Sequence, residues 1–189
     1  PEAYVRALTR LAETAGVAIL RASPLIGARE AGDRIEVMTP HESIHAATVV
    51  NAAGLYADDV SRMLGGESFT IYPARGEYAE LAPGSRHLVH GMVYPVPHMP
   101  GHSLGVHLTI DLGGQARFGP DVEWIERIDY TVDPTRSDSF YAAVRRYWPA
   151  LRDGQIQPGY AGIRPKIVPK GAPGQDFVIQ DRTTHGIPG

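Results

Sequence analysis

The chain has 189 residues, 43% of them hydrophobic and 21% charged, so it can bury a sizeable core in one large domain or two small ones. Its formal net charge of −3 and scattered basic residues give no electrostatic reason to bind nucleic acid. No run approaches the roughly 20 apolar residues that cross a bilayer, and no signal-peptide pattern is present, so we expect a cytoplasmic location. The absence of cysteine excludes disulfides, thiolate zinc sites and a cysteine nucleophile.

The first elements expected are a helix and three short strands. Apolar residues from Tyr4 to Ala15 recur every three or four positions, which predicts a helix over 2–15 with one buried stripe, ended by Gly16. Three β-like runs follow, separated by turn residues, and they predict strands at 17–21, 25–30 and 34–38.

A sharp corner is expected next. The β-branched run at 46–50 predicts a buried strand, which stops at Asn51, Ala52, Ala53 and Gly54, and helical spacing resumes over 55–64. Glycine permits a tight exit or a close approach of the backbone to a ligand. Strand, small-residue turn and helix together are typical of the corner where an open α/β sheet binds a nucleotide-like ligand. A plain buried strand ending in a tight turn would leave the same pattern.

The middle of the chain predicts a second module. A long strand is expected over 71–81, and proline- and glycine-rich punctuation predicts further strands at 93–97, 104–110 and 115–120, in an antiparallel sheet. Helical spacing returns over 137–148 and stops at Pro149. A last strand is expected at 177–180.

Two side chains are candidates for chemistry. Arg164 lies between Gly162 and Pro165, and its forked guanidinium suits a carboxylate, although a loop arginine can also be a solvated surface group. His107 alternates with apolar neighbours and can take a proton near neutral pH, or it can be a structural histidine. The histidines as a group lack metal-ligand spacing, so no metal site is predicted: His87, His90, His98, His102 and His107. No serine-hydrolase elbow or Walker-type loop is present.

Six short segments, taken in order, resemble the FAD-dependent oxidoreductases of the D-amino-acid oxidase superfamily. The resemblance is greatest to the branch of L-2-hydroxyglutarate dehydrogenases or oxidases. The segments are VVNAAG at 49–54, RGEY at 75–78, YPVP at 94–97, GVHLT at 105–109, GPD at 119–121 and GIRPK at 162–166.

The resemblance implies an α/β (α+β) fold. Part of a Rossmann-like FAD-binding domain, at 1–65, would be followed by an inserted mixed or antiparallel β-sheet substrate domain at 66–157, and 158–189 would return to the FAD-binding domain. The segment from Asn51 to Gly54, together with Gly162, would lie against FAD. Arg164 would bind the substrate carboxylate.

The same resemblance implies roles for three further side chains. His107 would take the hydroxyl proton while a hydride passes to the flavin, and Tyr78 and Tyr94 would line the pocket, although core packing explains both tyrosines equally. The glycine-rich phosphate loop and the closing segment of such enzymes do not appear in the sequence. We therefore expect an internal fragment, inactive alone, that holds little or no FAD by itself.

The function expected is the oxidation of a small 2-hydroxy acid to a 2-oxo acid. An amino-acid or amine oxidase on the same scaffold is an alternative, and a non-catalytic binding domain is another. The expected partner is a small carboxylate substrate, with no nucleic acid and no membrane span. The electron acceptor, oxygen or a quinone or dye, stays open.

Overall fold

The structure, a computed structural model, describes residues 2–96 and 105–187. The chain folds into two compact units. The first comprises Pro1–Asn51, Asp59–Glu67 and Gln180–Gly189, and the second comprises Ala52–Asp58 and Ser68–Ile179. The domain boundaries expected after residues 65 and 157 stay a prediction. Among the described residues, no helix combines the length and apolar character that crossing a membrane requires.

The first unit contains a helix and a small antiparallel sheet. Helix α1 (Glu2–Thr14) confirms the helix expected at 2–15, but the described structure buries none of its residues because no described helix or strand covers the apolar stripe. The sheet has the order β1 (Gly27–Ala31), β2 (Arg34–Met38) and β3 (Ser43–Ala46), which confirms the strands expected at 25–30 and 34–38. The short helix α4 (Arg182–His185) also belongs to this unit.

Two strands expected in this region are absent. Residues 17–21 form no strand, and β3 ends at Ala46, so the buried strand expected at 46–50 is wrong. Val50 is 82% exposed. A β-branched run becomes a strand only when a neighbouring strand completes its hydrogen bonds, and no described segment pairs with 47–50.

The turn and the helix of the expected corner are present, although the strand before them is not. Gly54 has a φ of +59° and opens the 3-10 helix η1 (Gly54–Tyr56), which leads into α2 (Ala57–Leu64). Gly65, with a φ of +76°, follows the end of that helix. The helix expected at 55–64 is therefore confirmed. Within the second unit, η1 contacts the long strand β8 (Ile156–Lys166).

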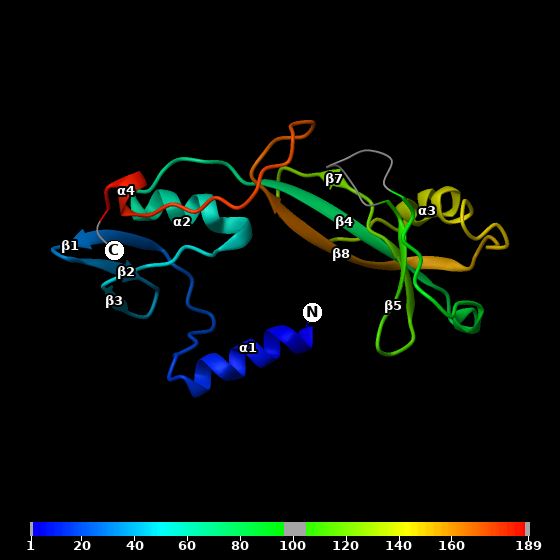
Figure 1. Cartoon of the computed structure of the whole chain (residues 1–189), viewed down its shortest axis with the longest axis horizontal. Coiled ribbons are helices and arrows are strands. Elements are labelled where there is room, and N and C mark those ends of the chain that lie inside the picture. Colours follow the sequence, from blue (N-terminus) through cyan, green and yellow to red (C-terminus); the bar gives the residue numbers. More distant parts are fainter. Residues whose placement is uncertain (1, 97–104, 188–189) are drawn as a thin grey trace. The chain divides into compact units, whose positions relative to one another are not determined.

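The second unit is built on an antiparallel sheet. The order is β5 (His107–Ile110), β6 (Ala116–Gly119), β4 (Tyr72–Leu81) and β7 (Glu123–Trp124), and β8 pairs with β4 as well. Figure 1 shows β4 and β8 as the two long neighbouring strands of this unit. The strand expected at 71–81 is confirmed, and those expected at 104–110 and 115–120 are present but shorter.

Strand β8 was not predicted. It contains Pro158, Gly159, Gly162 and Pro165, which weaken a strand signal, and the described sheet tolerates them because β8 pairs with β4 alone. The register runs from Tyr72 opposite Lys166 to Leu81 opposite Ile156.

A bulge interrupts this strand pair. Glu77 lies opposite Ala161 and Ala79 opposite Pro158, so two steps along β4 match three along β8. A Cβ on Gly159 would lie 2.7 Å from the Tyr78 carbonyl oxygen, so this close approach requires glycine. The extra residue reverses which side chains of β8 face which side of the sheet.

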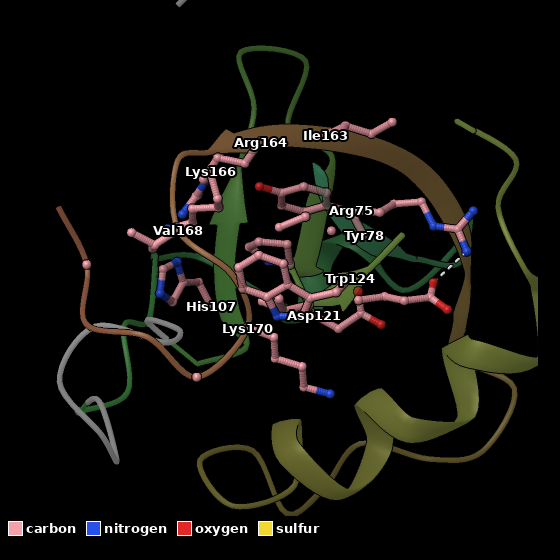
Figure 2. Close-up of a pocket in the computed structure, with 18 of the residues that line it drawn as sticks. Arg75, Tyr78, His107, Asp121, Trp124, Ile163, Arg164, Lys166, Val168 and Lys170 are labelled. Carbon is pink, nitrogen blue, oxygen red and sulfur yellow. Dashed lines mark hydrogen bonds and ion pairs between the residues drawn. The ribbon is translucent and has the colours of Figure 1, made fainter. Parts of the chain in front are cut away.

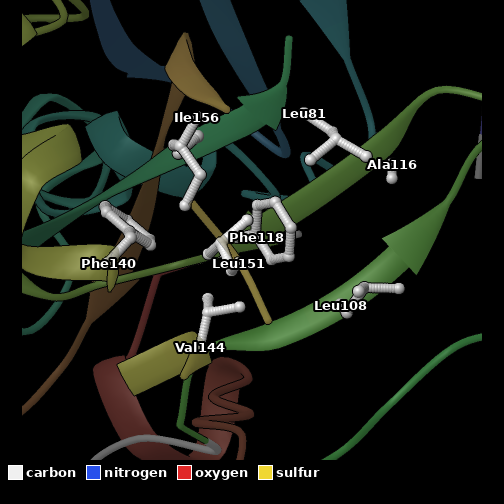
Figure 3. Packing of buried hydrophobic residues seen from close by; sticks show 9 residues of the cluster. Leu81, Leu108, Ala116, Phe118, Phe140, Val144, Leu151 and Ile156 are labelled. Carbon is white, nitrogen blue, oxygen red and sulfur yellow. The ribbon is translucent and has the colours of Figure 1, made fainter. Parts of the chain in front are cut away.

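The hydrophobic core covers one face of the sheet (Figure 3). Helix α3 (Ser137–Val144) packs against it, preceded by the 3-10 helix η3 (Pro134–Arg136). The helix expected at 137–148 is thus shorter than predicted. The buried cluster comprises Ala79, Leu81, Leu108, Ala116, Phe118, Phe140, Val144, Leu151 and Ile156. Side chains alternate along a strand, so the intervening positions of β4 face the other side.

Two further strand predictions are wrong. Near 93–97 only an isolated bridge joins Val93 to Leu108 in the described residues, and Tyr94 is exposed. No strand forms at 177–180, where Phe177 is 91% exposed, because no described strand pairs with this segment. Another short 3-10 helix, η2, spans Arg86–Leu88. Some residues of the sequence predictions lie outside the described residues: Pro97, His98, His102 and Leu104.

Candidate active site

A pocket of about 1010 Å³ opens on the face of the sheet opposite the core, entirely within the second unit (Figure 2). Ala74, Gly76 and Tyr78 of β4 line it at alternate positions. On β8, Gly162 lies opposite Gly76 and Arg164 opposite Ala74, so the two strands form one continuous wall. The rest of the wall comes from β5, from 120–124 and from the segment after β8.

The pocket gathers five of the residues singled out from the sequence: Tyr78, Tyr94, His107, Gly162 and Arg164. The corner residues are placed differently. Asn51 belongs to the first unit and Ala52, Ala53 and Gly54 to the second, and the described pocket lining includes none of them. Their contact with FAD stays a prediction.

Arg164 is an exposed cation on the pocket wall. In the part of the chain that the structure describes, its guanidinium has no carboxylate within ion-pair distance. The neighbouring Pro165 fixes the backbone φ, so the side chain leaves a rigid strand. Such a guanidinium can accept an anionic group from solution, and its fork matches a carboxylate in shape.

Tyr78 lies beside this arginine. Its ring stacks on Tyr160, with centroids 4.6 Å apart and planes 12° from parallel. Burial raises the pKa of Tyr78, the nearby Tyr160 adds to the rise, and the positive charge of Arg164 opposes it. The Tyr78 hydroxyl is therefore protonated at neutral pH, and a side-chain hydrogen bond with Tyr160 contributes to the raised pKa.

His107 lies at the start of β5, where it is 8% exposed. Its neighbour Leu108 enters the core while the imidazole lines the pocket, which is the alternation that the sequence pattern predicted. The ring of Tyr94 lies 4.6 Å from the imidazole at a tilt of 45°. The histidine thus packs against an aromatic ring and also lines the pocket.

An ion-pair network closes another side of the pocket. Arg75 Nη2 lies 2.6 Å from Glu123 Oε2, and Arg136 is paired with both Glu123 and Asp121. Glu77, which is 2% exposed, accepts a hydrogen bond from the Asp133 backbone N–H at 3.2 Å. Figure 2 shows the Arg75 guanidinium on the side of the pocket away from His107. The acidic lining residues Asp121 and Glu123 are therefore already paired with arginines, which they share with the buried Glu77.

Two lining residues escaped the sequence interpretation. Lys166 and Lys170 are the only lysines of the chain, and both line this pocket. Their isolation in sequence, just after Arg164, is a signal that could have identified them. Trp124, from the short strand β7, also lines the pocket. Within the described ranges, no group of three acidic or histidine side chains is placed to hold a metal ion.

Gly162 leaves part of the β8 wall bare. A Cβ built at this position would meet nothing within 4 Å, so the space in front of its backbone is open. Next to it, a Cβ on Gly76 would lie 2.7 Å from Pro120 Cβ. An open backbone wall between Tyr78 and Arg164 suits a flat ring, which could approach closer than any side chain would allow.

Comparison with known proteins finds a family whose sequence pattern matches almost the whole chain, and relatives of known name. Residues 1–187 match the family described as FAD dependent oxidoreductase. The chain is 46% identical over 156 residues to the mitochondrial L-2-hydroxyglutarate dehydrogenase of Arabidopsis thaliana, covering 75% of this chain and 32% of that protein. The L-2-hydroxyglutarate dehydrogenase of Escherichia coli K12 is 28% identical, with 95% of this chain and 52% of that protein covered. The chain therefore spans about a third to a half of the length of these relatives.

Solved structures share the fold. The L-α-glycerophosphate oxidase of Mycoplasma pneumoniae, solved with FAD bound, superimposes with a TM-score of 0.70 at 22% identity, over 82% of this chain and 41% of that one. Glycine oxidase from Geobacillus kaustophilus gives a TM-score of 0.60 at 20% identity, over 82% and 40% of the two chains. The α/β fold expected from the sequence is confirmed.

Proposed function

Because the chain belongs to the family of FAD-dependent oxidoreductases, we propose that the intact protein oxidises a small 2-hydroxy acid of the 2-hydroxyglutarate kind to the 2-oxo acid. The observation that supports this most is the convergence of Arg164, Tyr78 and His107 on one pocket. Two relatives named L-2-hydroxyglutarate dehydrogenase, at 46% and 28% identity, support the choice of substrate class.

The bare backbone at Gly162 fits the cofactor of this family. We infer that the flavin ring of FAD contacts this part of β8, because an open wall beside an aromatic and a cationic side chain suits a flat, polar ring. When bound, FAD acts as the oxidant, because its flavin ring can accept a hydride from the substrate C2. That 51–54 contact the same cofactor remains an expectation from sequence.

The substrate is held by its carboxylate in this proposal. Arg164 donates two parallel N–H bonds to the carboxylate oxygens, and the protonated Tyr78 hydroxyl can add a further bond when it exchanges its hydrogen bond with Tyr160 for one to the substrate. Because no described carboxylate competes for Arg164, the arginine does not have to break an existing ion pair to bind substrate.

His107 is proposed to take the proton of the substrate hydroxyl. A ring nitrogen that faces the pocket can accept this proton as the C–H bond breaks, which leaves a neutral carbonyl in the product. The Tyr94 ring, 4.6 Å from the imidazole, restricts how the imidazole can turn. An amine substrate can lose its proton without a dedicated base, so His107 distinguishes the two reaction classes.

Steady-state kinetics of the intact, FAD-containing protein test this proposal. His107→Gln should lower kcat for L-2-hydroxyglutarate by about 100-fold or more, and Arg164→Met should raise KM strongly. His90→Gln is the matched control, because the exposed His90 does not line the pocket. Reduction of the flavin by amino acids and not by 2-hydroxy acids would refute the proposed substrate class. An unchanged rate for His107→Gln would remove its role as the base.

A further inference from the structure

The pocket carries more positive charge than one carboxylate needs. Its acidic residues, Asp121 and Glu123, are already paired with arginines outside the β8 wall. On that wall, Arg164 and Lys166 have no ion-pair partner in the described part of the chain. Two neighbouring like charges repel each other, and this cost is offset when an anion with two negative groups binds between them.

The two cations share one face of β8. Their partners in the register are Ala74 for Arg164 and Tyr72 for Lys166, and the strand pair is regular here. Positions two apart on a strand lie on the same side, about 6.6 Å apart at ~3.3 Å per residue. The carboxyl carbons of an extended five-carbon diacid lie about 5 Å apart, given bonds of ~1.5 Å. Pro165 stiffens the backbone between the two side chains.

We propose that Lys166 binds the second carboxylate of the substrate and so makes the enzyme selective for 2-hydroxy diacids over monoacids of the same chain length. This inference rests on the proposed function, which assigns the 2-hydroxy acid carboxylate to Arg164. Arg164 then recognises the group common to all 2-hydroxy acids. Lys166 recognises the group that only the diacids carry.

The other lysine of the chain provides a matched control. Lys170 also lines the pocket, but it borders a second, smaller hollow together with Tyr72 and Glu126. Figure 2 shows its side chain extending away from Arg164 and Lys166. Replacing Lys170 removes the same charge from the same region without removing the contact proposed for Lys166.

The test compares L-2-hydroxyglutarate with L-2-hydroxyvalerate, which replaces the distal carboxylate by a methyl group, in the intact holoenzyme. The wild type should prefer the diacid in kcat/KM by about 10- to 100-fold, as expected for one charge-assisted hydrogen bond. Lys166→Met should lose most of that preference while the monoacid rate changes by less than ~3-fold. Lys166→Arg should retain part of the preference, and Lys170→Met should retain nearly all of it.

Three results would overturn the inference. Equal kcat/KM values for the two acids in the wild type would do so and would leave the proposed function intact. Equal losses on both acids in Lys166→Met, or equal effects of the two lysine variants, would show general electrostatic attraction instead of a specific contact. If no 2-hydroxy acid reduces the flavin, the proposed function fails. Calorimetric binding of glutarate against valerate to wild type and Lys166→Met then still decides the role of Lys166.

Discussion

Gly119 allows a quantitative test of the sheet that carries the pocket. Its φ is +131°, and a Cβ there would lie 2.9 Å from the Glu77 carbonyl oxygen, 3.1 Å from Tyr78 Cδ1 and 3.3 Å from Phe140 Cε1. The backbone conformation costs an L residue about 1–3 kcal/mol, and overpacking against a rigid carbonyl costs about 1–3 kcal/mol more. Gly119→Ala should therefore lower the free energy of unfolding by roughly 2–6 kcal/mol.

Three other glycines separate the two contributions. Gly76→Ala adds the clash alone, since its Cβ would lie 2.7 Å from Pro120 Cβ, and should cost about 1–3 kcal/mol. Gly114→Ala adds the strain alone, with a φ of +77° and no atom within 4 Å, and should cost about 1–2 kcal/mol. Gly91→Ala adds neither and should stay within about 0.5 kcal/mol of wild type.

Thermal and urea unfolding of the four variants in the intact protein measure this order. Gly119→Ala should be the least stable, Gly76→Ala and Gly114→Ala intermediate, and Gly91→Ala indistinguishable from wild type. If Gly119→Ala were no less stable than Gly114→Ala, the contact with the Glu77 carbonyl would have no energetic consequence. The close packing of β6 against β4 would then be wrong.

Three further changes should alter stability. Phe118→Ala removes a side chain with 0% exposure from the core and should cost about 3–5 kcal/mol in urea unfolding. Arg136→Met leaves Asp121 and Glu123 without this partner and should lower the free energy of unfolding by about 2–4 kcal/mol. The cost is smaller than for a fully buried pair because both carboxylates are partly exposed. A loss below about 0.5 kcal/mol would contradict the network. Burial raises the pKa of Tyr147 to about 12, so as the pH rises this tyrosine ionises in the unfolded chain before it ionises in the folded protein. Stability should therefore fall between pH 10 and about 12. Tyr147→Phe should make this fall smaller, as measured by Tm against pH.

Local patterns explain which elements could be predicted. The periodicity of α1 and the long apolar alternation of β4 are properties of the segments themselves, and both elements form. The segment 46–50 has equally strong β character but no described partner strand, and pairing is not a local property. For β8 the opposite holds, since glycine and proline weaken its signal while its pairing with β4 stabilises it.

The site shows the same contrast between features that depend on local sequence and features that depend on distant segments coming together. His107 and Arg164 could be proposed because their residue types and neighbours limit what they can do, and the fold then brought them to one pocket. Lys166 was overlooked because a lysine beside an arginine is unremarkable until the strand register places both on one wall. Asp121 gains its role through Arg136, 15 residues later in the sequence, and through the Glu77 backbone N–H, 44 residues earlier.

The bulge at Gly159 decides which face of the sheet the second half of β8 presents to the pocket, and the residue composition of the strand does not reveal this. Ile156 before it faces the core, and Gly162, Arg164 and Lys166 after it face the pocket, although all four are at even positions. Regular pairing of the same residues from Ile156 onward would turn both cations toward the hydrophobic core, whereas deleting one residue between 157 and 161 would remove the bulge and leave both cations on the pocket face. The anion binding proposed for Arg164 and Lys166 thus depends on one extra residue in this strand as much as on the identity of its side chains.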